Sequence, residues 1–142
     1  MRTCLLYIVI ALVGSGLSKS ASAQGVTANS LVGTWKLVSA KYGGEDSTLP
    51  QQFTTIKHFT PTHFMWVSYG EDGKVTRTAG GTYSFDGKRL EDTPMYGIGA
   101  DFNVVSKTLQ TYECRVVGKK LYQKGALSNG RSLEEVWELV EK

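Results

Sequence analysis

The feature that most constrains this chain is the even spacing of turn signals from residue 31 to the C-terminus. Residues 70–73 (GEDG), 86–87 (DG) and 128–130 (SNG) have the composition that tight hairpin turns require. No window between such signals has the apolar periodicity of a convincing helix. Short strands at this spacing are typical of a β-sandwich or a β-barrel.

Eight strands are predicted, and nearly all of their connections are short enough for consecutive strands to pair antiparallel. Such a meander can close on itself and remove its exposed edges, and a barrel of eight strands can hold one small ligand. The predicted fold class is therefore all-β, an eight-stranded antiparallel up-and-down barrel. The predicted strands span residues 31–42, 53–60, 63–69, 74–85, 88–95, 104–117, 119–127 and 131–140.

The N-terminus has the pattern of an export signal. Arg2 precedes an apolar run at residues 4–13, and Ala21-Ser22-Ala23 supplies small residues for cleavage before Gln24. The run is shorter than the roughly 20 residues of a membrane-spanning helix, which disfavours the alternative of an uncleaved anchor. We expect a signal peptide at residues 1–23, a flexible leader at 24–30 and a barrel domain at 31–142. The mature protein is then periplasmic or secreted, without stable membrane insertion.

The charge balance limits the possible binding partners, and the cysteine content limits the possible disulfides. The chain has 16 basic and 13 acidic residues, and the signal contains two basic residues and no acidic one, which leaves a net charge of +1. This balance gives no reason to expect a nucleic acid as partner. Cys114 is the only cysteine outside the signal, so an intramolecular disulfide is excluded. A small buried hydrophobe is the favoured interpretation of Cys114, with a reactive thiol as the alternative.

Alternation along the strands predicts which side chains face the barrel interior, because successive residues point to opposite faces. In the strand at 63–69 two phases stay open, one with Met65 and Tyr69 inside and the other with Phe64, Trp66 and Ser68 inside. We assign Met65 and Tyr69 to the interior. With the residues that face inward on the other strands, the candidate ligand-binding set is Met65, Tyr69, Arg77, Tyr83, Gln110, Tyr112, Gln123, Glu135 and Trp137.

This predicted interior mixes apolar side chains with Arg77, Gln110, Gln123 and Glu135. A solid core would not accept four polar groups, because each unpaired buried group costs on the order of 1–3 kcal/mol. A cavity that holds water or a ligand accepts them. Arg77 is the candidate anchor for an anionic ligand group, with two alternatives: its side chain reaches water at the barrel mouth, or it pairs with an internal acid such as Glu135.

The first predicted strand contains Gly33-Thr34-Trp35, which resembles the Gly-x-Trp that opens lipocalins and fatty-acid-binding proteins of the calycin type. The chain from Leu31 to Val140 is similar to the compact lipocalin-like domains of exported bacterial proteins. The similarity also includes residues 59–66 (FTPTHFMW) and Glu135-Val136-Trp137. The resemblance implies that Gly33 and Trp35 close one end of the barrel. The Arg-x-Tyr carboxylate clamp of fatty-acid-binding proteins is missing, so a fatty-acid ligand is not implied.

Catalytic and metal-binding signatures are weak. The sequence has no nucleophile elbow, zinc-protease motif or phosphate loop, and Glu134 and Glu135 are neighbours that point to opposite faces. His58 and His63 lack the further ligands that a metal site needs. We therefore predict no enzymatic activity, no metal and no cofactor.

The leading functional prediction is an exported protein that binds a small amphipathic or hydrophobic molecule inside the barrel. The alternative is a protein-interaction or inhibitor module with a filled core. Residues 97–103 (GIGADFN) lie at the predicted open end, either as a mobile lid or as an ordinary loop.

Overall fold

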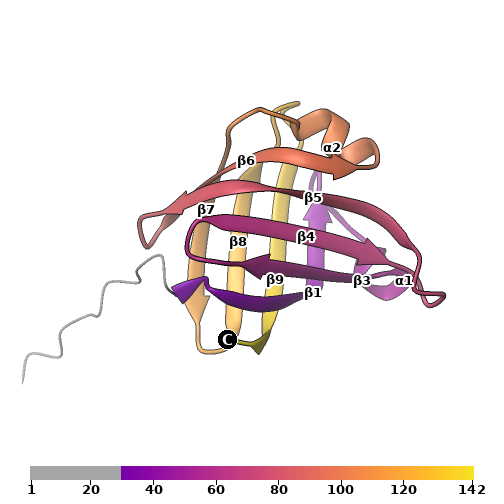
Figure 1. The fold of residues 1–142 in the computed structure, drawn as a ribbon, viewed down its shortest axis with the longest axis horizontal. Helices are drawn as coiled ribbons and strands as arrows, with labels where there is room; N and C mark the ends of the chain where they lie inside the picture. Colours follow the sequence, from indigo (N-terminus) through magenta and orange to yellow (C-terminus); the bar gives the residue numbers. More distant parts are fainter. Residues whose placement is uncertain (1–29) are drawn as a thin grey trace, which may run out of the picture.

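A computed structural model describes residues 30–142. The expected signal peptide and nearly all of the expected leader lie outside the described residues. The elements are β1 (Gly33–Tyr42), β2 (Glu45–Asp46), α1 (Leu49–Gln52), β3 (Thr54–Phe59), β4 (His63–Tyr69), β5 (Val75–Phe85), β6 (Arg89–Ile98), α2 (Ala100–Val105), β7 (Gln110–Val117), β8 (Lys120–Ala126) and β9 (Ser132–Glu141). Figure 1 shows them along the chain.

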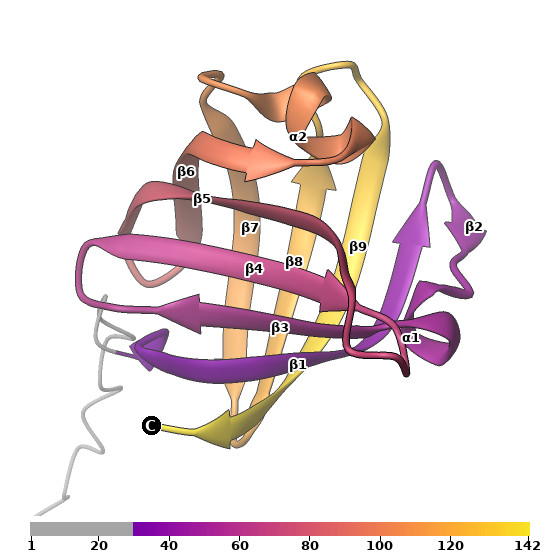
Figure 2. The same ribbon diagram turned by 45° about the vertical axis from the view of Figure 1, so that its right-hand side comes forward.

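The strands form one antiparallel meander that closes into a barrel. They follow the order β1-β3-β4-β5-β6-β7-β8-β9, each paired with its neighbour, and β9 pairs back onto β1. The two-residue strand β2 only extends the edge of β1. Figure 2 shows β1, β3, β4 and β5 crossing β7, β8 and β9 at a steep angle, so the barrel resembles two orthogonal layers. The predicted eight-stranded meander is confirmed.

One end of the barrel is closed where β1 begins and β9 ends. Trp35 is fully buried there, and its Nε1 donates a hydrogen bond of 2.8 Å to the carbonyl oxygen of Leu31. Gly33 has a φ of +141°, and a Cβ at this position would lie 2.7 Å from the carbonyl oxygen of Glu141. Only glycine fits this backbone conformation and this close approach without strain.

The other end of the barrel collects the longer connections. Because the strands alternate in direction, residues 43–53, 70–74, 99–109 and 127–131 all lie at this open end. The helix α2 lies across it beside β6 (Figure 1). The Oγ of Ser128, in the β8–β9 turn, donates a hydrogen bond of 2.9 Å to the carbonyl oxygen of Val104 in α2.

The helix α2 corrects two sequence predictions. Residues 104–109 were expected to begin a strand, but α2 occupies 100–105 and β7 starts at Gln110. Residues 97–103 were expected to be a loop, but β6 continues to Ile98 before Gly99, with a φ of +98°, leads into α2. Strands β6 and β7 pair only between Arg89–Asp92 and Gln110–Glu113. Because β7 begins opposite Asp92, the rest of β6 has no partner in β7, and α2 packs against β6 there.

The phase of β4 is the opposite of the one assigned from sequence. Phe64 pairs with Phe59 of β3 and is buried, and their ring centroids lie 6.5 Å apart. Met65 points outward and is 39% exposed. The placement of Met65 inside the barrel is therefore wrong, because packing of Phe64 against Phe59 fixes the face that turns inward.

Candidate ligand-binding cavity

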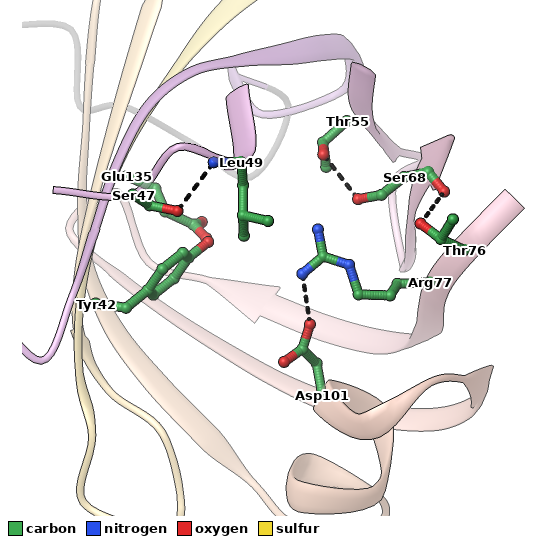
Figure 3. Close-up of polar contacts among 9 residues, drawn as sticks. All are labelled: Tyr42, Ser47, Leu49, Thr55, Ser68, Thr76, Arg77, Asp101 and Glu135. Atoms are coloured by element: carbon green, nitrogen blue, oxygen red, sulfur yellow. Dashed lines mark hydrogen bonds and ion pairs between the residues drawn. The ribbon is translucent and has the colours of Figure 1, made fainter. Parts of the chain in front are cut away.

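A cavity of about 430 Å³ extends from the barrel interior to its open end. Its inner wall comes from the barrel strands, and its mouth comes from the segment after β1, from α2 and from the β8–β9 turn. Figure 3 shows Tyr42, Thr55, Ser68, Arg77 and Glu135 turned toward one common space. The aromatic and aliphatic part of the lining includes Leu37, Phe64, Trp66, Tyr112, Leu133 and Trp137.

Five of the nine candidate residues line this cavity, namely Arg77, Tyr112, Gln123, Glu135 and Trp137. The other four have different surroundings. Met65 faces outward, and Tyr69 follows an irregularity in the β4–β5 pairing and lies outside the lining. The hydroxyl group of Tyr83 donates a hydrogen bond of 2.7 Å to the carbonyl oxygen of Thr60.

Gln110 is buried, but its side chain forms hydrogen bonds with the backbone and does not line the cavity. Its Nε2 donates to the carbonyl oxygen of Thr108 at 2.9 Å, and its Oε1 accepts from the amide of Ser128 at 3.0 Å. The first contact lies at the turn into β7, and the second joins it to the β8–β9 turn. The polar character of Gln110 is thus explained by the chain reversal beside α2, and no ligand is needed to satisfy it.

Glu135 is the most heavily engaged side chain in the cavity. Its Oε1 accepts a hydrogen bond of 2.7 Å from the hydroxyl group of Tyr42, and its Oε2 accepts one of 3.0 Å from Nε1 of Trp137. The Nζ of Lys57 lies 3.7 Å from the same Oε2. Burial is the main cause that raises the pKa of Tyr42, with the Glu135 charge adding to it, so the tyrosine remains a donor. Two donors and one cation compensate the buried carboxylate.

Lys57 was missed by the sequence analysis. It is buried, and its Nζ donates a hydrogen bond of 3.0 Å to Oε1 of Gln123 and lies 4.0 Å from the centre of the Trp137 ring. The apolar Ile56, next to Lys57 in the sequence, suggests instead that Ile56 faces inward on β3 and Lys57 faces outward. The signal that would have found Lys57 is Phe59, which shares its face and belongs to the core.

Asp92 was also missed, and it is the unsatisfied polar group of the cavity. It is 7% exposed, and its Oδ1 has no hydrogen-bond partner among residues 30–142. Burial raises the pKa of Asp92 to about 7, against the opposing charge of Lys57, and Glu135 raises it further. The fully buried Leu90, two residues earlier on β6, was the available signal for an inward Asp92.

Arg77 lies at the mouth, where it pairs with an acid of α2. Its Nη1 donates to Oδ2 of Asp101 at 2.9 Å (Figure 3). The guanidinium carbon lies 5.7 Å from the centre of the Phe53 ring. The ion pair joins β5 to α2. Of the expected alternatives, pairing with an acid is found, but the acid is the partly exposed Asp101 at the mouth and not an internal one such as Glu135.

The remaining reactive residue types lie away from the cavity lining. Cys114 is buried, and burial raises the pKa of its thiol to about 12, so the thiol stays protonated near neutral pH. His58 and His63 contact Thr34 and Thr62 at 3.1 and 2.8 Å. Within residues 30–142 no His, Cys, Asp and Glu side chains gather as a metal site, and no helix is long and apolar enough to cross a bilayer.

The family is decided by comparison with known domains. The family model of the lipocalin-like domain matches residues 31–111, more than half of the 142-residue chain. The chain belongs to the lipocalin-like domain family. This lipocalin-like chain matches no curated protein.

Two solved structures resemble the lipocalin-like barrel. The first is a lipocalin-like protein from Bacteroides uniformis, with a TM-score of 0.53 and 16% identity over 77% of this chain and 97% of that one. The second is a redesigned β-barrel, with a TM-score of 0.51 and 15% identity over 82% of this chain and 97% of that one. At these identities the likeness establishes the fold of the lipocalin-like chain alone.

Proposed function

We propose that this protein is an exported, non-enzymatic binding protein that holds one small amphipathic molecule inside its barrel. The observation that carries the proposal is the cavity of about 430 Å³, lined by aromatic and aliphatic side chains with a few polar groups. Ligand pockets generally have volumes from about 300 to 1,000 Å³ and this mixed lining. The apolar wall suits a hydrophobic body, and the polar groups suit a head group.

The cavity volume also separates this proposal from an interaction module. A barrel that acts only through its rim or outer wall needs no internal space, and a filled core would be the more stable solution. An unfilled interior with buried charges reduces stability, which is expected when the space has a use.

The proposal is tested with N-phenyl-1-naphthylamine, an apolar probe whose fluorescence rises in a dry environment. We expect a saturable increase at one probe per chain. Ser68→Phe places a ring in the cavity, since Ser68 is buried and lines it. This variant should lose most of the signal. Met65→Phe adds a ring to the outer face of the same strand and is the matched control, which should bind as the wild type does.

Circular dichroism of both variants checks that they remain folded. Non-saturable binding, or equal binding by both folded variants, would show that the probe does not occupy the cavity. That result would favour the alternative, a protein-interaction or inhibitor module.

A further inference from the structure

One hydrogen-bond acceptor of the cavity lining, on Asp92, has no donor to match it among the described residues. Both oxygens of Glu135 are used by Tyr42, Trp137 and Lys57, and Lys57 itself is used by Gln123. The Oδ1 of Asp92 is the buried cavity atom that lacks a partner among the described residues. A buried acceptor without a donor costs on the order of 1–3 kcal/mol, and a ligand that donates to the Asp92 carboxylate would offset this cost.

The charges that line the cavity point the same way. The lining contains five acidic residues and three basic ones, although the whole sequence carries a net charge of +3. Three of these acids already have a cation at short range: Asp46 near Lys41, Asp101 near Arg77, and Glu135 near Lys57. Asp92 lies deep on β6 without such a contact in residues 30–142. An ionised Asp92 is therefore left without an ion-pair partner of its own in a buried position, since Lys57 lies against Glu135, and a protein tolerates such a charge poorly.

We propose that Asp92 is the recognition group for a ligand that carries a primary ammonium group on an apolar body. The inference rests on the proposed function, because it specifies the head group of the molecule in the same cavity. An ammonium group supplies both the missing donor and the missing positive charge, whereas a hydroxyl group supplies only the donor. The aromatic rings of Tyr112, Trp66 and Trp137 are available to the apolar body.

This assignment makes binding depend on pH. The titratable groups that face Asp92 come from four strands: Lys57 on β3, Tyr83 on β5, Tyr112 and Cys114 on β7, and Glu135 on β9. Burial raises the pKa of both tyrosines and of the thiol away from neutral pH. Lys57 and Glu135 form an ion pair with each other. Asp92, with its pKa raised to about 7, is the group that gains charge in this range, so an ammonium ligand should bind better as the pH rises.

The test uses three molecules with the same body, namely decylamine, decan-1-ol and decanoate, measured by quenching of tryptophan fluorescence. Trp66 and Trp137 line the cavity and report on its occupation. At pH 8 decylamine should bind the wild type at least about tenfold more tightly than decan-1-ol. Between pH 6 and pH 8 its affinity should rise roughly tenfold, since alkylammonium groups keep their proton there. The affinity of decan-1-ol should stay constant.

Asp92→Asn removes the charge and keeps the shape of the side chain. It should lower the affinity for decylamine to that for decan-1-ol and abolish the pH dependence. The matched control is Asp46→Asn, which removes a carboxylate from the cavity mouth and should keep the preference for the amine. The melting temperatures of both variants show whether they are folded. The pH series on the wild type tests the inference independently of either variant.

Three results would overturn the inference: equal affinities for decylamine and decan-1-ol, a preference for the amine that survives in Asp92→Asn, or tightest binding of decanoate. The last result would make Arg77 or Arg131 the anchor instead. If N-phenyl-1-naphthylamine binds in the cavity while the amine shows no preference, the ammonium inference fails and the proposed function stands. If neither the probe nor any decyl compound binds, both fail.

Discussion

Trp35 closes the barrel through its bulk and through one hydrogen bond. Its side chain is fully buried, and Nε1 satisfies the carbonyl oxygen of Leu31. The sequence motif and the resemblance together were enough to predict this placement. The same could not be done for Lys57 and Asp92, because a charged side chain on a strand normally marks the solvent face. Their inward positions follow from neighbours two residues away, Phe59 and Leu90, whose burial depends on the whole fold.

Trp35→Ala should reduce the free energy of unfolding by about 3–5 kcal/mol, because it leaves a large cavity and an unsatisfied carbonyl group. Urea denaturation followed by far-ultraviolet circular dichroism measures the change. Trp35→Phe keeps most of the volume and should cost less. A loss below about 1 kcal/mol in the alanine variant would mean that Trp35 does not close the barrel.

Asp92 gives the fold a pH dependence of unusual sign. Its pKa is about 7 in the folded chain and near 3.8 in the unfolded chain. The folded state holds the proton more tightly, so the contribution of Asp92 to stability is greatest below pH 4 and is lost as the pH rises to about 7. Between pH 5 and pH 8 this loss should amount to about 2–3 kcal/mol. Asp92→Asn should remove it.

The measurement is the free energy of unfolding of the wild type and of Asp92→Asn at both pH values. Other titrating groups contribute equally to the two proteins, so the difference between them isolates Asp92. Parallel pH profiles would show that Asp92 keeps an ordinary pKa in the folded chain.

At the scale of elements, the inward face of a strand was predictable where apolar and polar residues alternate clearly along it. On β5 the buried Tyr83 and Phe85 alternate with the exposed Thr82 and Ser84, which agrees with the assignment of Tyr83 to the interior. On β4 both faces contain large apolar residues, so alternation gave no preference. The helix α2 has six residues, fewer than two full turns, which is too short to produce a periodic signal.

The Arg77–Asp101 ion pair is expected to hold α2 against β5. Arg77→Met removes the charge and keeps an apolar stem, and Asp101→Asn removes the other partner. Each variant should increase the rate of amide hydrogen exchange within α2 several-fold. The effect on global stability should be at most about 1 kcal/mol, because the pair is partly exposed.

Amide exchange within β8 is the internal reference for this experiment, since that strand does not touch the ion pair. A coupling energy near zero between the two substitutions in a double-mutant cycle would show that the pair does not hold the helix.

At the scale of the molecule, the meander topology was predictable because short connections leave consecutive strands few ways to pair. The cavity was predictable only in outline. Gln123 and Glu135 line it, which agrees with their assigned inward positions, but its volume depends on side chains from all eight strands. The ion pair between β5 and α2 could not be predicted, because the sequence pattern did not indicate the helix α2.

We expect the protein to be exported and to begin at Gln24, after cleavage following Ala23. Intact mass measurement of protein recovered from outside the cytoplasm, supported by N-terminal sequencing, tests this prediction. The expected mass is that of residues 24–142, with allowance for cyclisation of the terminal glutamine. An exported chain that retains Met1 would contradict it.

The end of the β6–β7 pairing at Asp92 has a consequence for how fast the proposed ligand can exchange. A molecule that passes beside α2 breaks no β6–β7 ladder, but only local contacts such as the hydrogen bond of 2.7 Å from the amide of Lys107 to the carbonyl oxygen of Pro94. The residence time of the ligand should then follow the local opening of a six-residue helix, and the lifetime of the folded barrel should have little influence on it. Substitutions that make the barrel harder to unfold would leave the rate of ligand release unchanged. The residence time of the ligand and the stability of the fold can therefore evolve separately in this protein.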